Sequence, residues 1–248
     1  RDWREKKYVE KKGFRQCGTF DVVKNWHTFC VFSRDFSRNN ALNIIKNADA
    51  LIDKGEVLKS GRTAIVSKIN VDGKGYVIKR YNKKSGLHQF FRCLMESRAA
   101  VSWKNGHLLE FNHIPTASPV LLFEKRWGIC RKKSYILTEY REGIHAFDFF
   151  KSNIDVESKV DMAIKVTKLI HHFHQCCFIH GDLKAHNIWI ARGEPLLIDL
   201  DGMKKVKRNK PRVFRHDWLR LYKDLRENDV AEVLFQNVKS NDFIGLEK

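Results

Sequence analysis

The chain has 248 residues, of which 43% are hydrophobic and 12% aromatic, so it can bury a core and does not have the composition of a disordered sequence. No run approaches 18 consecutive apolar residues, so no transmembrane helix is expected. The formal net charge of +18 predicts an anionic partner: nucleic acid, an anionic membrane face or an acidic substrate.

The chain begins with an arginine rather than a methionine, so the lack of a signal peptide carries little information. The cysteines show no CxxC spacing, which in a chain of this size favours reduced thiols in a cytosolic protein. Residues 1–15 form a basic arm, either simply solvated or in contact with a membrane or substrate. Its cations are Arg1, Arg4, Lys6, Lys7, Lys11, Lys12 and Arg15.

The next part of the chain is predicted to contain strands and one helix. Residues 20–32 are typical of one or two short strands, and residues 40–53 have apolar residues at helical spacing. Residues 57–81 predict two antiparallel strands, because the turn signal Asp72-Gly73-Lys74-Gly75 separates two β-branched or aromatic runs. Lys79 lies late in the second of these strands.

Residues 87–103 lack Gly and Pro and have apolar residues at steps of three and four, which predicts a helix that Gly106 ends. Strands follow at residues 119–123 and 135–140, and helices at 157–175 and 213–226. This order favours an α+β protein with a strand-rich lobe, a helical lobe and a cleft between them. We expect a basic arm and extension over 1–55, the strand-rich lobe over 56–140 and the helical lobe over 141–248.

Two motifs after the long helix place acid and amide groups in a fixed order. His180-Gly181-Asp182-Leu183-Lys184-Ala185-His186-Asn187 is followed by Ile198-Asp199-Leu200-Asp201-Gly202. Phosphoryl transfer needs a base for a hydroxyl proton, oxygen ligands for Mg²⁺ and cations for the phosphates. Asp182 suits the base, Asn187 and Asp199 suit the metal ligands, and Lys79 suits the cation that holds the phosphates.

A zinc site is the competing interpretation of this region, since His171, His174 and Cys176 lie close together in the sequence. Structural zinc sites use four ligands at spacings that are absent here, so we do not expect zinc.

The motifs resemble those of the protein-kinase-like superfamily. His180-x-Asp182-x-x-x-x-Asn187 is similar to the catalytic loop, Asp199 begins a segment similar to Asp-Phe-Gly, and Val77-Ile78-Lys79 is similar to Val-Ala-Ile-Lys. Within the superfamily, the stretch from Asp182 to Ile188, with Leu197 to Asp201, closely resembles the lipopolysaccharide core sugar kinases, the Kdo and heptose kinases. The later Asp217-Trp218-Leu219-Arg220-Leu221 is similar to their segment after the active site.

The resemblance implies a bilobal protein-kinase-like fold, with an antiparallel-sheet N-lobe and a mainly helical C-lobe. It implies a kinase that uses ATP and Mg²⁺ to phosphorylate a sugar hydroxyl, of Kdo or heptose, in the lipopolysaccharide inner core. The acceptor would be an anionic glycolipid at the cytoplasmic face of the inner membrane, with an anionic membrane surface nearby and no nucleic acid. The oligomeric state stays open.

The resemblance also implies roles for further residues. Ser60 and Gly61 stand in the reduced glycine-rich loop, Glu96 is the candidate partner of Lys79, and the backbone at Glu139 and Tyr140 would bind adenine. Lys184 would steady the transferred phosphate. His180 and Asp217 would support the catalytic loop, and Asp201 would either bind metal or cap a turn. These expectations stand on the following residues: Ser60, Gly61, Lys79, Glu96, Glu139, Tyr140, His180, Asp182, Lys184, Asn187, Asp199, Asp201 and Asp217.

Other functions stay open beside this one. A small atypical protein kinase or an antibiotic phosphotransferase also fits the loop, and the charge permits a nucleic-acid-binding or pseudokinase scaffold, although no nucleic-acid-binding signature is present. A second basic run follows the metal segment and would suit an anionic acceptor. Its members are Lys204, Lys205, Lys207, Arg208, Lys210, Arg212 and Arg215.

Overall fold

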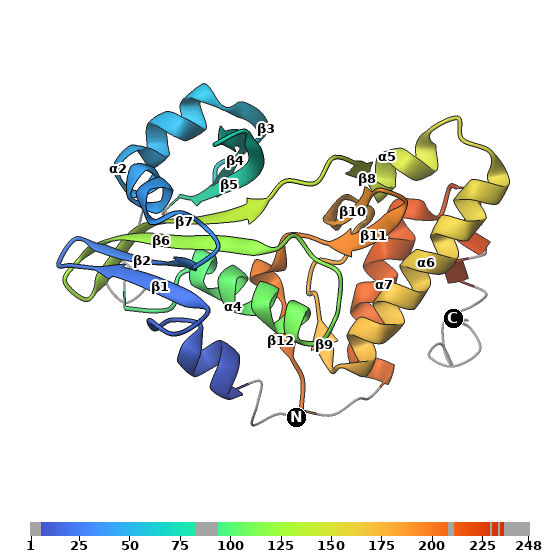
Figure 1. The fold of residues 1–248 in the computed structure, drawn as a ribbon. Coiled ribbons are helices and arrows are strands. Elements are labelled where there is room, and N and C mark those ends of the chain that lie inside the picture. The colour runs from blue at the N-terminus through green and yellow to red at the C-terminus, as the bar shows by residue number, and fades with distance from the viewer. Residues whose placement is uncertain (1–5, 83–93, 208–210, 229, 233, 236–248) are drawn as a thin grey trace. The chain divides into compact units, whose positions relative to one another are not determined.

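The structure is a computed structural model that describes residues 6–82, 94–207, 211–228, 230–232 and 234–235. The described residues fall into two compact units (Figure 1). The first comprises Arg1–Phe111 with Ala117–Arg141, and the second comprises Asn112–Thr116 with Glu142–Lys248. Within the described part of the chain, no helix is long and apolar enough to cross a membrane.

The first unit is built on a seven-stranded antiparallel sheet with strand order β1-β2-β6-β7-β5-β4-β3 (Figure 1). The π-helical turn η1 (Lys6–Lys12) precedes it. The strands are β1 (Phe20–Lys24), β2 (Thr28–Ser33), β3 (Glu56–Ser60), β4 (Ala64–Val71), β5 (Lys74–Tyr81), β6 (Pro119–Trp127) and β7 (Cys130–Glu139). The predicted strands and the antiparallel arrangement of this unit are confirmed, but β3 is a third strand where residues 57–81 were predicted to form only two.

The hairpin between β4 and β5 fixes the register of the strand that carries Lys79. Asp72 and Gly73 form the turn with φ angles of 51° and 78°, and glycine adopts such positive values without strain. Pairing then runs along both strands, so that Lys79 lies opposite Val66 of β4 and Ile136 of β7.

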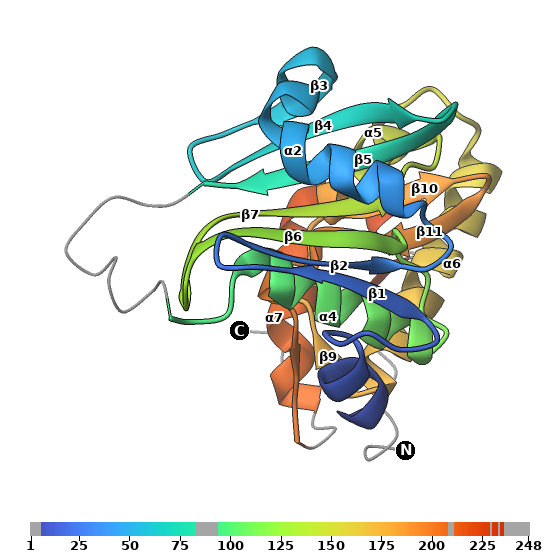
Figure 2. The same ribbon diagram turned by 60° about the vertical axis from the view of Figure 1, so that its left-hand side comes forward.

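Helices cover both faces of the sheet, α2 (Arg38–Lys54) on one and α4 (Arg98–Phe111) on the other (Figure 2). Ile78 packs with α2, whereas Tyr81 packs with Trp103 of α4. Because side chains alternate along a strand, Lys79 shares its face with Tyr81. Fully buried side chains such as Trp103 and Ile44 each contribute ~1.5–3 kcal/mol of transfer free energy.

The helix predicted over residues 87–103 is wrong in its bounds. Residues 87–93 lie outside the described residues, residues 94–97 are not helical, and α4 continues through Gly106 to Phe111. Gly106 does not end the helix, and its lack of a side chain instead allows close packing. A Cβ there would lie 2.3 Å from Cγ of Pro119 at the start of β6.

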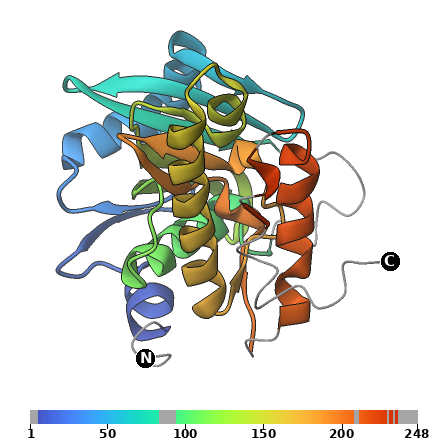
Figure 3. The same cartoon turned by 90° about the vertical axis from the view of Figure 1, so that its right-hand side faces the viewer.

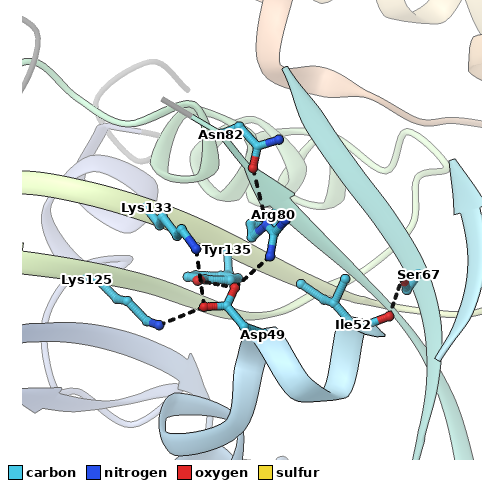
Figure 4. Close-up of polar contacts among 8 residues, drawn as sticks. All are labelled: Asp49, Ile52, Ser67, Arg80, Asn82, Lys125, Lys133 and Tyr135. Atoms are coloured by element: carbon cyan, nitrogen blue, oxygen red, sulfur yellow. Dashed lines mark hydrogen bonds and ion pairs between the residues drawn. The ribbon is translucent and has the colours of Figure 1, made fainter. Parts of the chain in front are cut away.

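A cluster of charged side chains joins α2 to the sheet, with Asp49 at its centre (Figure 4). Oδ1 of Asp49 accepts hydrogen bonds from Arg80 and Tyr135, at 2.8 and 2.9 Å. Oδ2 accepts from Lys125 and Lys133, at 3.0 and 3.4 Å. Burial alone would raise the pKa of Asp49, but hydrogen bonds from Arg80, Lys125 and Tyr135 outweigh it and hold the pKa well below its usual range.

The Asp49→Asn variant tests this cluster. Because the side chain of Asp49 is 33% exposed, solvent screens the charges, and we expect the free energy of unfolding to fall by only ~1–2 kcal/mol at pH 7. The folded-state pKa is depressed, so this stabilisation is present above the unfolded pKa of ~3.9 and is lost as the pH falls further. Urea unfolding at pH 7 and pH 3 measures the difference, which should shrink at acid pH. The matched control is Asp53→Asn, an exposed position on the same helix. An equal effect of both substitutions would contradict the assignment.

The second unit is mainly helical, as predicted (Figure 3). Its α-helices are α5 (Ala146–Lys151), α6 (Val156–Gln175) and α7 (Pro211–Leu225). Short elements connect them: β8 (Ile144–His145), β9 (Phe178–Ile179), η2 (Ala185–Asn187), β10 (Ile188–Ala191), β11 (Glu194–Leu197), η3 (Leu200–Gly202) and β12 (Lys204–Lys205). Asp155 caps α6 by accepting a hydrogen bond from the backbone N–H of Ser158 at 2.7 Å. His174 of α6 packs against Phe214 and Trp218 of α7.

The cysteines differ from one another in state. Cys17, Cys30, Cys176 and Cys177 are free thiols, but Cys130 is disulfide-bonded. The prediction of reduced thiols is therefore wrong for Cys130.

Candidate functional site

The predicted catalytic loop lies in the second unit and runs from His180 to Asn187, between β9 and β10. Gly181 has a φ of 78°, and a Cβ there would lie 3.0 Å from the carbonyl oxygen of Gly202. The loop therefore passes close to the segment that contains Asp199, and only glycine fits this turn without strain. Pairing of β9 with β12 continues the same close approach.

Asp217 of α7 holds the start of this loop. Its carboxylate accepts hydrogen bonds from the backbone N–H groups of His180 and Gly181, at 2.8 and 3.0 Å, and from Nε2 of His174 at 3.3 Å. Burial alone would raise the pKa of Asp217, but the bonds from His174, His180 and Gly181 lower it below its usual value. The predicted supporting role of Asp217 is confirmed.

His180 connects the predicted catalytic loop to the segment Ile198–Gly202, which contains Asp199. It is fully buried, and its Nε2 lies 3.0 Å from the carbonyl oxygen of Ile198. A carbonyl only accepts, so Nε2 carries the proton. The carbonyl oxygen of Asn187 accepts a second bond, from the backbone N–H of Ile198 at 3.0 Å. The buried bond from Nε2 to Ile198 gives His180 the supporting role that the sequence predicts.

Three side chains contact the carboxylate of Asp182. Asn187 Nδ2 donates to the backbone oxygen of Asp182 at 2.8 Å and to its Oδ2 at 3.3 Å. Lys184 Nζ lies 3.6 Å from Oδ2, and Arg220 Nε lies 2.5 Å from Oδ1. The structure thus brings Asp182, Lys184 and Asn187 together, with Arg220 as an additional member.

Asp199 follows Ile198 directly and precedes η3, which contains Asp201. Its φ of 61° lies in the left-handed region that non-glycine residues rarely adopt, at a cost of ~1–3 kcal/mol. Backbone strain of this kind is common at functional sites, because the surrounding structure must hold it in place.

The side-chain chemistry of the two predicted metal ligands, Asn187 and Asp199, fits a magnesium ion. Nδ2 of Asn187 is committed to Asp182, so its amide oxygen is the atom that remains for a metal. Together with the Asp199 carboxylate it would supply two hard oxygen ligands. Among the described residues, no group of three or more His, Cys, Asp or Glu could hold a metal. Magnesium is usually held by one or two protein ligands plus substrate phosphates, so the set suits it.

The nucleotide-binding residues predicted in the first unit lie on separate strands. Lys79 is half-buried on β5, with Nζ 4.8 Å from the ring centroid of Tyr81. Ser60 ends β3 and Gly61 begins the exposed turn into β4, where its N–H donates to Ala64.

Glu139 and Tyr140 follow one another at the end of β7. Glu139 accepts a hydrogen bond from Lys74 at 2.6 Å, and the N–H of Tyr140 donates to the carbonyl of Gly75 at 3.1 Å. Both residues therefore contact the start of β5, the strand that contains Lys79.

Glu96 does not lie on a helix, contrary to the expectation. It precedes α4 and forms an ion pair with Lys104 at 3.1 Å. Glu110 is the single acid within α4, and it contacts His107. The role of Glu96 as the partner of Lys79 stays a prediction.

Sequence reasoning missed Arg220 and Asp224. Asp224 accepts a hydrogen bond from the backbone N–H of Ala185 at 3.0 Å. The signal was available, because both residues follow Asp217 at helical spacing of three and seven.

The comparisons with known proteins give a family and a fold for this chain. The family model described as "Lipopolysaccharide kinase (Kdo/WaaP) family" matches residues 46–240. No curated protein matches the chain. Among solved structures, the chain is similar to "WaaP in complex with acyl carrier protein", with a TM-score of 0.58, 17% identity, and coverage of 84% of this chain and 88% of that chain.

At this identity the likeness to WaaP shows the fold, and the predicted α+β kinase-like fold is confirmed. Because the family model spans more than half of the chain, this protein belongs to the lipopolysaccharide kinase (Kdo/WaaP) family and is a phosphotransferase.

Proposed function

We propose that the protein is an ATP-dependent kinase that phosphorylates a sugar hydroxyl, of Kdo or heptose, in the lipopolysaccharide inner core. One observation carries this proposal: the half-exposed carboxylate of Asp182 is contacted by Asn187 and Lys184 in a loop that Asp217 holds. Such a carboxylate suits a base for an incoming hydroxyl. Membership of a lipopolysaccharide kinase family supports the choice of acceptor.

In the proposed reaction Asp182 takes the proton of the acceptor hydroxyl. The acceptor oxygen bonds to the γ-phosphorus, and the bond from that phosphorus to the bridging oxygen breaks to release ADP. Lys184 would contact the transferred group. Asn187 and Asp199 would hold Mg²⁺, which neutralises phosphate charge when bound.

The first unit contains the predicted nucleotide-binding lobe over residues 56–140, and we propose that this lobe binds ATP. Lys79 would hold the non-transferred phosphates, and Ser60 and Gly61 would cover them. The backbone carbonyl oxygens of Glu139 and Tyr140 would bind adenine, because the N–H groups of both residues already donate to other backbone carbonyls. The lobe over 141–248 would contain the catalytic loop, and residues 1–55 would extend the first lobe.

The acceptor is proposed to be an anionic glycolipid at the cytoplasmic face of the inner membrane. Exposed cations after the metal segment support this, because a basic surface concentrates anionic substrates and lipids. Those in the described residues are Lys204, Lys205, Lys207, Arg212 and Arg215. The similar WaaP structure contains acyl carrier protein, so we also propose that a carrier protein be tested as a partner, by co-purification.

Transfer of label from γ-labelled ATP tests the proposal. We expect label to enter purified core glycolipid in a magnesium-dependent reaction, and not to enter added proteins or aminoglycosides. Label in protein alone would favour an atypical protein kinase, and label in the antibiotic would favour an antibiotic phosphotransferase. Mass spectrometry of the labelled core then identifies the sugar and its hydroxyl.

A further inference from the structure

One face of α7 carries three charged residues that contact the catalytic loop in chain order. Asp217, Arg220 and Asp224 are spaced by three and four residues, so they lie on the same side of the helix. α7 thus follows the loop along its length, one helical turn for each contact.

The two acids hold the backbone at both ends of the loop. Asp217 binds the N–H groups of His180 and Gly181, as described above. Asp224 accepts from the N–H of Ala185, and its Oδ2 lies 3.9 Å from Nδ1 of His186. Asp182 lies between these two anchored positions. Arg220, the middle of the three charged residues on α7, contacts it there.

Arg220 contacts one oxygen of the Asp182 carboxylate, Oδ1, and no contact with the other oxygen, Oδ2, is described. Its Nε is 2.5 Å from Oδ1, as an ion pair rather than an aligned hydrogen bond. Oδ1 is shielded from water although the Asp182 side chain as a whole is 39% exposed. The accessible oxygen is therefore Oδ2, whose contacts with Asn187 and Lys184 are longer, at 3.3 and 3.6 Å.

We propose that Arg220 is a positioning residue that holds Oδ1 of Asp182 and turns Oδ2 toward the acceptor hydroxyl. This rests on the proposed role of Asp182 as the base. Arg220 is itself 47% exposed, and ion pairs between exposed groups contribute little to stability. The orientation of a base within hydrogen-bond reach of its proton, in contrast, strongly affects the rate. The pair is therefore expected to matter for catalysis and not for folding.

Steady-state kinetics of the full chain with purified core glycolipid test this role. For Arg220→Gln we expect kcat to fall by about 10²-fold, since a misplacement of ~1 Å has an effect of this size. KM for ATP should stay near the wild-type value, and so should the melting temperature. Arg220→Lys should recover part of kcat, because lysine restores the positive charge with a shorter reach. The matched control is Lys223→Gln, an exposed cation on the same helix, which should behave as wild type.

The possible outcomes separate the two proposals. Wild-type kcat in Arg220→Gln would overturn the positioning role while leaving Asp182 as the base. Equal loss in the glutamine and lysine variants, together with lower melting temperatures, would also overturn it, since Arg220 would then be structural. Full activity of an Asp182 variant would instead overturn the proposed function.

Discussion

The Asp182→Asn variant is expected to lose phosphate transfer to core glycolipid, with kcat lowered by ~10²–10⁴-fold, the usual contribution of a positioned general base. Asparagine has nearly the same shape as aspartate, so the contacts of the loop backbone with Asp217 should persist. The amide cannot take the hydroxyl proton at neutral pH, and the reaction loses its base.

Initial rates with labelled ATP measure the effect, and thermal unfolding checks that the fold is intact. Asp161→Asn serves as the control, because Asp161 lies on α6 with a side chain that is 65% exposed. Full activity of Asp182→Asn would contradict the assignment. So would an equal loss of activity in both variants.

The Asp217→Ala variant is expected to lose both activity and stability. Alanine removes the acceptor for the N–H groups of His180 and Gly181, and it leaves His174 without its buried partner. Because Asp217 is only 2% exposed, we expect the free energy of unfolding to fall by ~3–5 kcal/mol. Urea unfolding measures the loss, and Lys223→Ala on the same helix should leave stability near that of wild type.

The pH dependence of this effect has a definite sign. The pKa of Asp217 is lowered in the folded protein, so its contribution is complete above the unfolded pKa of ~3.9 and disappears as the pH falls. The gap between wild type and variant should therefore shrink in acid. If Asp217→Ala does not fold, Asp217→Asn gives the same information, since its Nδ2 would face an N–H donor. Normal stability and activity of the asparagine variant would sink the anchoring role.

The family model and the likeness to WaaP agree with the kinase family and the kinase-like fold that the sequence motifs predict. His180 to Asn187 and Ile198 to Gly202 are local in sequence, and phosphoryl transfer restricts which residue types suit each role. Several elements could be predicted in the same way, because apolar periodicity and turn residues are local properties. They are strands β4 and β5 and helices α2, α6 and α7.

The two ends of α4 could not be predicted from such patterns. Apolar periodicity favoured residues 87–103, and Gly106 looked like a helix end. The helix includes Gly106, and the residue there is glycine because Pro119 packs against it at a distance that leaves no room for a Cβ. Tertiary packing therefore overrode a local signal.

The sequence by itself determined the type of chemistry, the order of the predicted catalytic motifs and the longer helices and strands other than α4. Only the tertiary structure decided which charges meet. Asp49 binds cations that lie on three strands, β5, β6 and β7. Arg220 contacts Asp182 from α7, a helix that begins well after the loop. The physical reason is that spacing along a helix or strand specifies a face, whereas the partner of that face depends on how the whole chain buries its apolar surface.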